Sequence, residues 1–160
     1  MIEDLLFALT FVSALGCGLI AGVFFAFSAF VMKALVRLPP AQGIAAMQSI
    51  NVVVINPLFM VALFGTALAC VGLAVSSFFR WSEPSAVYSL VGSLLYLVGT
   101  IAVAMVFNVP RNDALAAADP DSADGARLWV GYVTSWTAWN SVRTATALAA
   151  AALLTFALLR

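Results

Sequence analysis

The sequence predicts an all-α integral membrane protein, a single transmembrane four-helix bundle over residues 1–160 with a longer polar loop between helices 3 and 4. Composition is the first observation: 64% of the 160 residues are hydrophobic and 9% are charged, whereas a soluble domain carries roughly 45–50% apolar and about 25% charged residues. The second is that uncharged runs cover residues 5–32, 52–79, 85–107 and 144–159. A hydrocarbon core of ~30 Å needs about 20 helical residues, so each run is expected to span the membrane.

The segments between these runs set the connections. Residues 33–51 contain Pro39, Pro40 and Gly43, residues 80–84 form a tight connection, and residues 108–135 are the longest polar segment. The fourth run is short unless its helix begins earlier. Asp121 or Ser122 can cap a helix that starts near residue 122 or 123, and no proline follows to interrupt it. A helix continuing from there into the fourth span is therefore expected.

Four spans place the polar segments on two membrane faces. The termini and the 80–84 connection share one face, called here the terminal face, and segments 33–51 and 108–135 share the other, the loop face. The loop face carries more of the positive charge, with Lys33, Arg37, Arg111, Arg127 and Arg143 against Arg80 and Arg160. The positive-inside rule then predicts a cell (inner) membrane protein with its termini outside and loops 1 and 3 in the cytoplasm. A net charge of zero gives no field to attract nucleic acid, which is not an expected partner.

The asparagines lie on one side only. All of them fall at or beside the loop face: Asn51, Asn56, Asn108, Asn112 and Asn140. Residues that merely wet the membrane boundary should occur at both faces, as aromatic belts do. The asymmetry therefore indicates a site at the loop face.

Helical spacing defines one face of the last helix. A stripe at intervals of three and four residues contains Trp129, Tyr132, Trp136, Asn140 and Arg143, with Trp139 at its edge. Arg143 has two interpretations: its side chain extends outward as an interfacial anchor, or it turns into the bundle toward Asn56 and Asn108. The second is favoured because an anchor does not need asparagines on every neighbouring segment, although an asparagine before a proline is also ordinary turn and cap chemistry.

Four segments in this order resemble the anthrone oxygenase-like family of small four-helix membrane proteins: GVFFAFSAFVMKAL (22–35), AMQSINVVVINPLF (46–59), NVPRNDALA (108–116) and WTAWNSVRT (136–144). The resemblance implies a membrane-embedded, cofactor-independent oxygenase acting on an anthrone-type or other enolisable hydrophobic aromatic. Characterised fungal members oxidise anthrones to anthraquinones, and an anthrone enolate reacts with dioxygen directly. Such a site needs an apolar aromatic slot, a base, and donors that stabilise an oxyanion.

Residues of these types supply the predicted site. The predicted catalytic residues are Arg143, Asn140 and Ser141, and the predicted substrate-binding residues are Asn56, Asn108, Trp136, Trp139, Asn51, Arg111 and Asn112. Because the chain has no histidine and no carboxylate inside a span, no metal and no cofactor is expected at this site. The family commonly has histidine at the position of Ser141, and a lone serine hydroxyl is a poor proton acceptor.

Two classes of function therefore stay open. In the first, solvent and the arginine promote enolisation, and the protein is an oxygenase-like enzyme. In the second, it is a non-enzymatic integral membrane protein that binds a lipid or hydrophobic small molecule or supports a membrane complex. Transport is disfavoured, because transporters usually place ionisable residues or broken helices at the membrane midplane.

Overall fold

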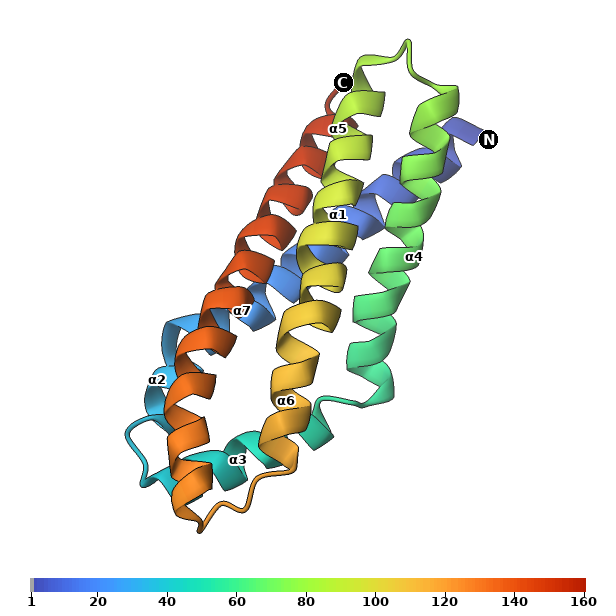
Figure 1. The fold of residues 1–160 in the computed structure, drawn as a ribbon. Helices are drawn as coiled ribbons and strands as arrows, with labels where there is room; N and C mark the ends of the chain where they lie inside the picture. The colour runs from blue at the N-terminus through green and yellow to red at the C-terminus, as the bar shows by residue number, and fades with distance from the viewer. Residues whose placement is uncertain (1) are drawn as a thin grey trace.

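The computed structural model describes residues 2–160, and this part of the chain is helical without strands. Four of its helical stretches are long and apolar enough to cross a membrane: Ile2–Leu35, Pro57–Phe79, Pro84–Ala116 and Ala123–Leu158. They pack side by side with both termini at one end, the upper end of Figure 1. The predicted all-α fold with four apolar spanning helices is confirmed.

All four spans are continuous helical stretches; the second and fourth are α-helical throughout, and the first and third include π-helical turns. The first consists of α1 (Ile2–Ala26), the π-helical turn η1 (Phe27–Val31) and α2 (Met32–Leu35), the second is α4 (Pro57–Phe79), and the fourth is α7 (Ala123–Leu158). The third joins α5 (Pro84–Leu94), the π-helical turns η2 (Leu95–Ala102) and η3 (Ala104–Asn108), and α6 (Val109–Ala116). A further helix, α3 (Pro40–Val53), crosses the loop face below α4 and α6 (Figure 1).

The helix starts follow from local chemistry. Pro57 occupies the first turn of α4, and the Asn56 side chain caps this helix by accepting a hydrogen bond of 3.1 Å from the Phe59 amide. The second span therefore begins at Pro57 and not at residue 52 as predicted, because residues 54–56 leave the helix. Ser122 caps α7 through a 2.9 Å hydrogen bond from the Gly125 amide. The predicted start of this helix and its continuity into the fourth span are confirmed.

Two segments interpreted as loops are mostly helical. Residues 33–51 contain most of α3, and residues 108–135 contain α6 and the first third of α7, which leaves 117–122 as the connection between helices 3 and 4. The predicted loop between helices 3 and 4 is thus much shorter than residues 108–135, because most of that segment is helical. Polar residues at the ends of helices that project beyond the hydrocarbon look like loop residues by composition alone.

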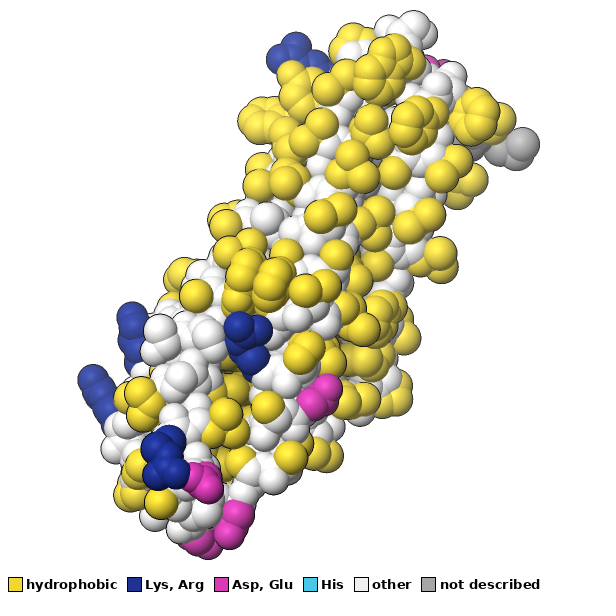
Figure 2. All heavy atoms as spheres, viewed as in Figure 1, with side chains coloured by type: hydrophobic (Ala, Val, Ile, Leu, Met, Phe, Trp, Pro, Cys, Tyr) yellow, Lys and Arg dark blue, Asp and Glu magenta, His cyan; other side chains and the backbone are white. Residues whose placement is uncertain are grey.

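Small residues bring the helices of the bundle close together. A Cβ atom on Gly16 of α1 would lie 2.1 Å from Thr66 Oγ1 of α4, and one on Gly99 of η2 would lie 2.6 Å from Thr146 Cβ of α7. The buried side chains form one cluster inside the spans and another under the loop face. The outer surface is apolar over its length, while most charged side chains in view lie at the two ends (Figure 2).

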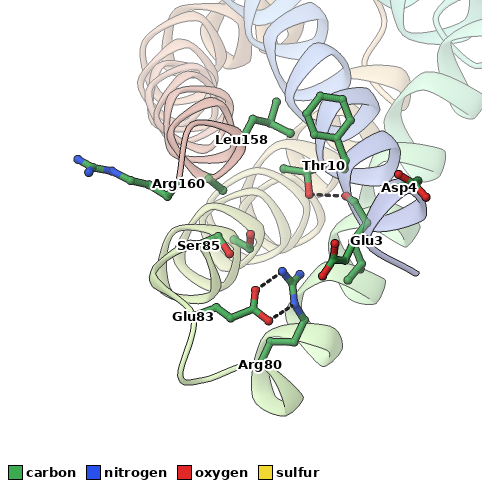
Figure 3. Close-up of a pocket in the computed structure, with 12 residues that line it drawn as sticks. Glu3, Asp4, Thr10, Arg80, Glu83, Ser85, Leu158 and Arg160 are labelled. Carbon is green, nitrogen blue, oxygen red and sulfur yellow. Dashed lines mark hydrogen bonds and ion pairs between the residues drawn. The ribbon is translucent and has the colours of Figure 1, made fainter. Parts of the chain in front are cut away.

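The terminal face is hollowed between α1, α4, α5 and the end of α7. Glu3, Arg80 and Glu83 lie around this depression of about 440 Å³ (Figure 3). Arg80 Nε donates a 3.1 Å hydrogen bond to the Glu83 carboxylate, and a second guanidinium nitrogen pairs with the other carboxylate oxygen. This hydrogen bond lowers the pKa of Glu83 below its usual range. The depression contains none of the predicted site residues.

Candidate functional site

A cavity of about 90 Å³ lies inside the bundle near the loop face. Residues of α1, η1, α3, α4, α6 and α7 line it, so it forms only where helices distant in sequence meet. Its aromatic side chains are Phe24, Phe27, Phe59 and Trp136, and its polar side chains are Asn51, Asn112, Asn140 and Arg143. An aromatic slot with a few convergent polar groups is typical of a site for a small hydrophobic ligand.

Arg143 is the charged residue of this cavity. Its side chain turns into the bundle and is only 7% exposed, so the anchor interpretation is wrong. Within residues 2–160 it forms no ion pair, since the pairs of the described chain are Arg80–Glu83 and Arg127–Asp124. Its Nε is buried without a hydrogen-bond partner. A buried guanidinium that lacks a counter-charge favours an anionic or strongly polar ligand oxygen.

Further unused polar atoms face the same region. Asn140 donates through Nδ2 to the Phe24 carbonyl at 2.7 Å and to Ser28 Oγ at 2.8 Å, while its Oδ1 has no partner. The Nδ2 of Asn51 is also buried without a partner. Two donors, on Arg143 and Asn51, and one acceptor, on Asn140, thus belong to residues that line the cavity and have no partner within hydrogen-bond distance, although the Asn51 amide lies near the Tyr132 hydroxyl. Buried polar groups are normally satisfied within a protein.

The aromatic wall is held by Asn112. Its Oδ1 accepts hydrogen bonds from Tyr132 Oη at 2.9 Å and from Trp136 Nε1 at 2.8 Å. The rings of Trp129, Tyr132 and Trp136 follow one another with centroids 5.6 and 6.1 Å apart. All five members of the predicted stripe, Trp129, Tyr132, Trp136, Asn140 and Arg143, are buried, which confirms that this face of α7 turns inward.

The expected contact of Arg143 with Asn56 and Asn108 is not found. Asn56 uses its side chain at the start of α4, where it accepts from Phe59 and donates to the Val53 carbonyl at 3.0 Å. Asn108 is buried and donates to the Trp136 carbonyl at 3.2 Å, joining η3 to α7. Neither residue lines the cavity. Asn51 and Asn112 of the predicted set lie there with Arg143.

Three other predicted residues lie outside the cavity. Trp139 stacks on Phe107 with ring centroids 3.6 Å apart, and Arg111 joins α6 to α7 by a 2.9 Å hydrogen bond to Ser135 Oγ. Ser141 is exposed on the other side of α7, where its Oγ donates to Ser28 Oγ at 3.0 Å. The Ser141 and Asn140 side chains thus share Ser28 Oγ as a hydrogen-bond partner and have no hydrogen bond to each other.

The aromatic residues of the first and second spans were missing from the predicted site. Phe24 and Phe27 occur in a phenylalanine-rich stretch that is explained equally well by lipid contact, and Phe59 lies in an apolar run. The spacing of three residues between Phe24 and Phe27 is the signal that they share a helix face. No aspartate or glutamate lines the cavity, and residues 2–160 contain no group of three or more His, Cys, Asp or Glu side chains able to hold a metal ion.

Comparison with known proteins assigns the family. Residues 57–153, more than half of the chain, match the family model described as anthrone oxygenase. No curated protein and no solved structure shows a significant match. The matched region includes Asn112, Trp136, Asn140 and Arg143 of the cavity, while Phe24, Phe27 and Asn51 precede it. By this match the chain belongs to the anthrone oxygenase family.

Proposed function

We propose that this membrane protein binds the enolate of an enolisable hydrophobic aromatic, of the anthrone type, in the Arg143 cavity and promotes its oxygenation. The observation that supports this most directly is the buried guanidinium of Arg143, which has a free Nε, no carboxylate partner and an aromatic-lined cavity beside it. The enolate oxygen would accept hydrogen bonds from Arg143 and from Asn51. Both donors are stronger toward an anion than toward the neutral ketone, so they favour the enolate over the ketone.

The reaction balances without a further co-reactant. Loss of a methylene proton gives the enolate, whose ring carbon transfers electrons to dioxygen and, with a proton, forms a hydroperoxide. Loss of water from this hydroperoxide converts the carbon to a carbonyl. One anthrone and one O₂ therefore yield one anthraquinone and one H₂O. The role of the protein is to stabilise the anion in a site of low polarity, where electrostatic stabilisation is strongest.

The size of the cavity sets a condition on binding. An apolar cavity of about 150 Å³ holds one benzene molecule, and the present cavity of about 90 Å³ is smaller. A three-ring ligand therefore requires the lining side chains to move. Val54 is one of the non-helical residues 54–56 that separate α3 from α4, and Phe59 follows them in the first turn of α4. We infer that this part of the wall can shift more easily than a helix interior.

One observation favours the second function, binding without turnover. The cavity contains no carboxylate or histidine, and Ser141 lies on the far side of Ser28. No side chain of the cavity is thus suited to remove the methylene proton. In this second function the protein retains the ionised ligand and solvent alone sets the rate of proton loss.

Oxygen uptake by the purified protein in lipid nanodiscs distinguishes the two functions. With anthrone as the probe, an oxygenase consumes one O₂ for each quinone formed, at a rate above that of empty nanodiscs. Arg143→Met should lower this rate by roughly 10- to 150-fold, the effect of losing one hydrogen bond to a charged group. Arg127→Met, which removes an exposed arginine, is the control.

The absorption spectrum of bound anthrone completes the test. Appearance of the enolate spectrum with oxygen uptake equal to that of empty nanodiscs would support binding without turnover. Equal uptake and equal enolate signal in the wild type and the Arg143→Met variant would overturn the assignment of this cavity as the site.

A further inference from the structure

A second hollow lies on the outside of the bundle at the loop face, between η1 and α2 on one side and α7 on the other. It has a volume of about 670 Å³, and its lining includes Ser28, Met32, Lys33, Arg37, Thr137 and Ser141. We call it the outer groove. No residue lines both the outer groove and the Arg143 cavity, although Ser28 of the groove accepts a hydrogen bond from Asn140 of the cavity. The inference below does not rest on the proposed oxygenation.

The groove has positive charge at one end only. Lys33 and Arg37 are separated by four residues, are both exposed, and form no ion pair within residues 2–160. No aspartate or glutamate lines the groove. Two unpaired cations beside an apolar surface are complementary to a ligand that carries a negative charge on a hydrophobic body.

Hydroxyl groups follow the cations toward the membrane interior. Thr134, Thr137 and Ser141 recur at intervals of three and four along α7, so they share one face of this helix, and all three line the groove. The Oγ1 of Thr137 is buried without a hydrogen-bond partner. Ser28 lies five residues before Lys33, about 7 Å deeper along its helix. The groove therefore changes from charged to hydroxyl-bearing with depth, and beyond it the exposed surface of α7 is apolar, with Leu148 60% exposed.

We propose that the outer groove binds one anionic phospholipid of the surrounding bilayer. The phosphate lies against Lys33 and Arg37, an ester carbonyl accepts a hydrogen bond from the Thr137 hydroxyl, and an acyl chain continues over the exposed side of α7 beyond Ser141. The order of phosphate, ester and hydrocarbon in a phospholipid matches the order of the cations and hydroxyls in the groove and the apolar surface of α7 beyond it. With the loop face in the cytoplasm, as the positive charges predict, the groove meets the leaflet that is richer in anionic lipid.

Native mass spectrometry of the full-length protein in detergent tests this inference. The probes are phosphatidylglycerol and phosphatidylcholine with identical acyl chains, so that only the headgroup differs. Two interfacial cations together favour an anionic lipid by roughly 30-fold. We expect the first phosphatidylglycerol to bind roughly 30-fold more tightly than phosphatidylcholine, and the double variant K33Q/R37Q to lose this preference.

The matched control is the double variant R127Q/R160Q, which removes the same net charge at exposed positions outside the groove. It should keep the preference for phosphatidylglycerol. Equal binding of the two lipids by the wild type would overturn the proposal, and so would an equal loss of preference in the two double variants, because that loss would reflect net charge. Thr137→Val, which removes the unpartnered hydroxyl, should weaken both lipids by a similar factor.

Discussion

The guanidinium carbon of Arg143 lies 3.7 Å from the centre of the ring of Phe24, a residue in the last turn of α1. The negative face of the ring offsets part of the positive charge, which no carboxylate of residues 2–160 neutralises by an ion pair. The ring also covers one side of the guanidinium group, so that a ligand would have to approach it from another side. Phe24 thus has a role in positioning Arg143 beyond filling space.

Replacing Phe24 with leucine should therefore weaken enolate binding. Loss of a cation–π contact of about 0.5–2 kcal/mol corresponds to roughly 2- to 30-fold in affinity, and the freed guanidinium is held less firmly. The neighbouring Phe25 is 61% exposed, and Phe25→Leu is the matched control with no expected change. Titration with anthrone, followed by the enolate absorption band, measures both. Equal affinities for the two variants would contradict a positioning role for Phe24.

Asn51 and Asn56 should separate binding from stability. Asn51→Leu removes an unpartnered donor of the cavity, so ligand affinity should fall while thermal stability stays the same or rises. Asn56→Ala removes the cap of α4 and should cost about 1 kcal/mol of stability with affinity unchanged. Circular dichroism melting and ligand titration on the same preparations provide the comparison. A loss of ligand affinity in the Asn56→Ala variant would show that Asn56 contributes to the binding site.

Asn51 and Asn56 also show which parts of the site can be predicted from the sequence and which cannot. The apolar runs and the spacing of Trp136, Asn140 and Arg143 were sufficient to predict four spans and the inward face of α7, because both depend on helical periodicity. Which asparagine meets Arg143 depends on how α3 crosses the loop face, and a short helix of mixed composition leaves little signal in the sequence. The side chain of Asn56 caps the N-terminus of α4 and therefore does not reach Arg143. Capping is an ordinary role for an asparagine that precedes a proline.

The contact between α1 and α4 should tolerate no side chain at Gly16. A Cβ there would lie 2.1 Å from Thr66 Oγ1, whereas a Cβ on Gly18 meets no neighbouring atom within 4 Å. Gly16→Ala should destabilise the bundle by about 1–3 kcal/mol, and Gly18→Ala should be neutral or slightly stabilising. Unfolding in mixed micelles measures the difference. Equal stability of the two variants would mean that α1 and α4 are not packed this closely.

Ser141→His should add a base beside the site. The imidazole would stand outside the cavity, at the position of a hydroxyl that contacts Ser28, and the proton would pass to it through the Ser28 hydroxyl, which also contacts Asn140 of the cavity. We expect faster oxygen uptake with anthrone, rising with pH through the ordinary histidine pKa of about 6.5 as the ring becomes neutral. Ser141→Asn serves as a polar control that cannot accept the proton. A pH–rate profile identical to that of the control would show that a base at this position does not reach the ligand.

The Arg80–Glu83 pair of the terminal face should make stability depend on pH. Arg80 lowers the pKa of Glu83, so the pair stabilises the fold above the unfolded carboxyl pKa of about 4.3 and loses this effect as the pH falls through the lowered value. Because the pair is exposed, the effect should be small. The difference in melting temperature between the wild type and Glu83→Gln should be positive at pH 6 and vanish at pH 2.5. If the difference in melting temperature were the same at both pH values, the Arg80–Glu83 pair would not be its cause.

The length of α7 determines how a ligand reaches Arg143. Its 36 residues extend about 54 Å, against a hydrocarbon core of ~30 Å. With Leu158 at one boundary of the core, about 20 residues cross it and end near Trp139, so that Arg143 would lie just inside the other boundary. A hydrophobic ligand with one polar oxygen concentrates at this depth of the bilayer. Under the proposed oxygenation, the concentration that governs turnover is the mole fraction of substrate in the membrane, so adding inert lipid at constant total substrate should slow the reaction by surface dilution.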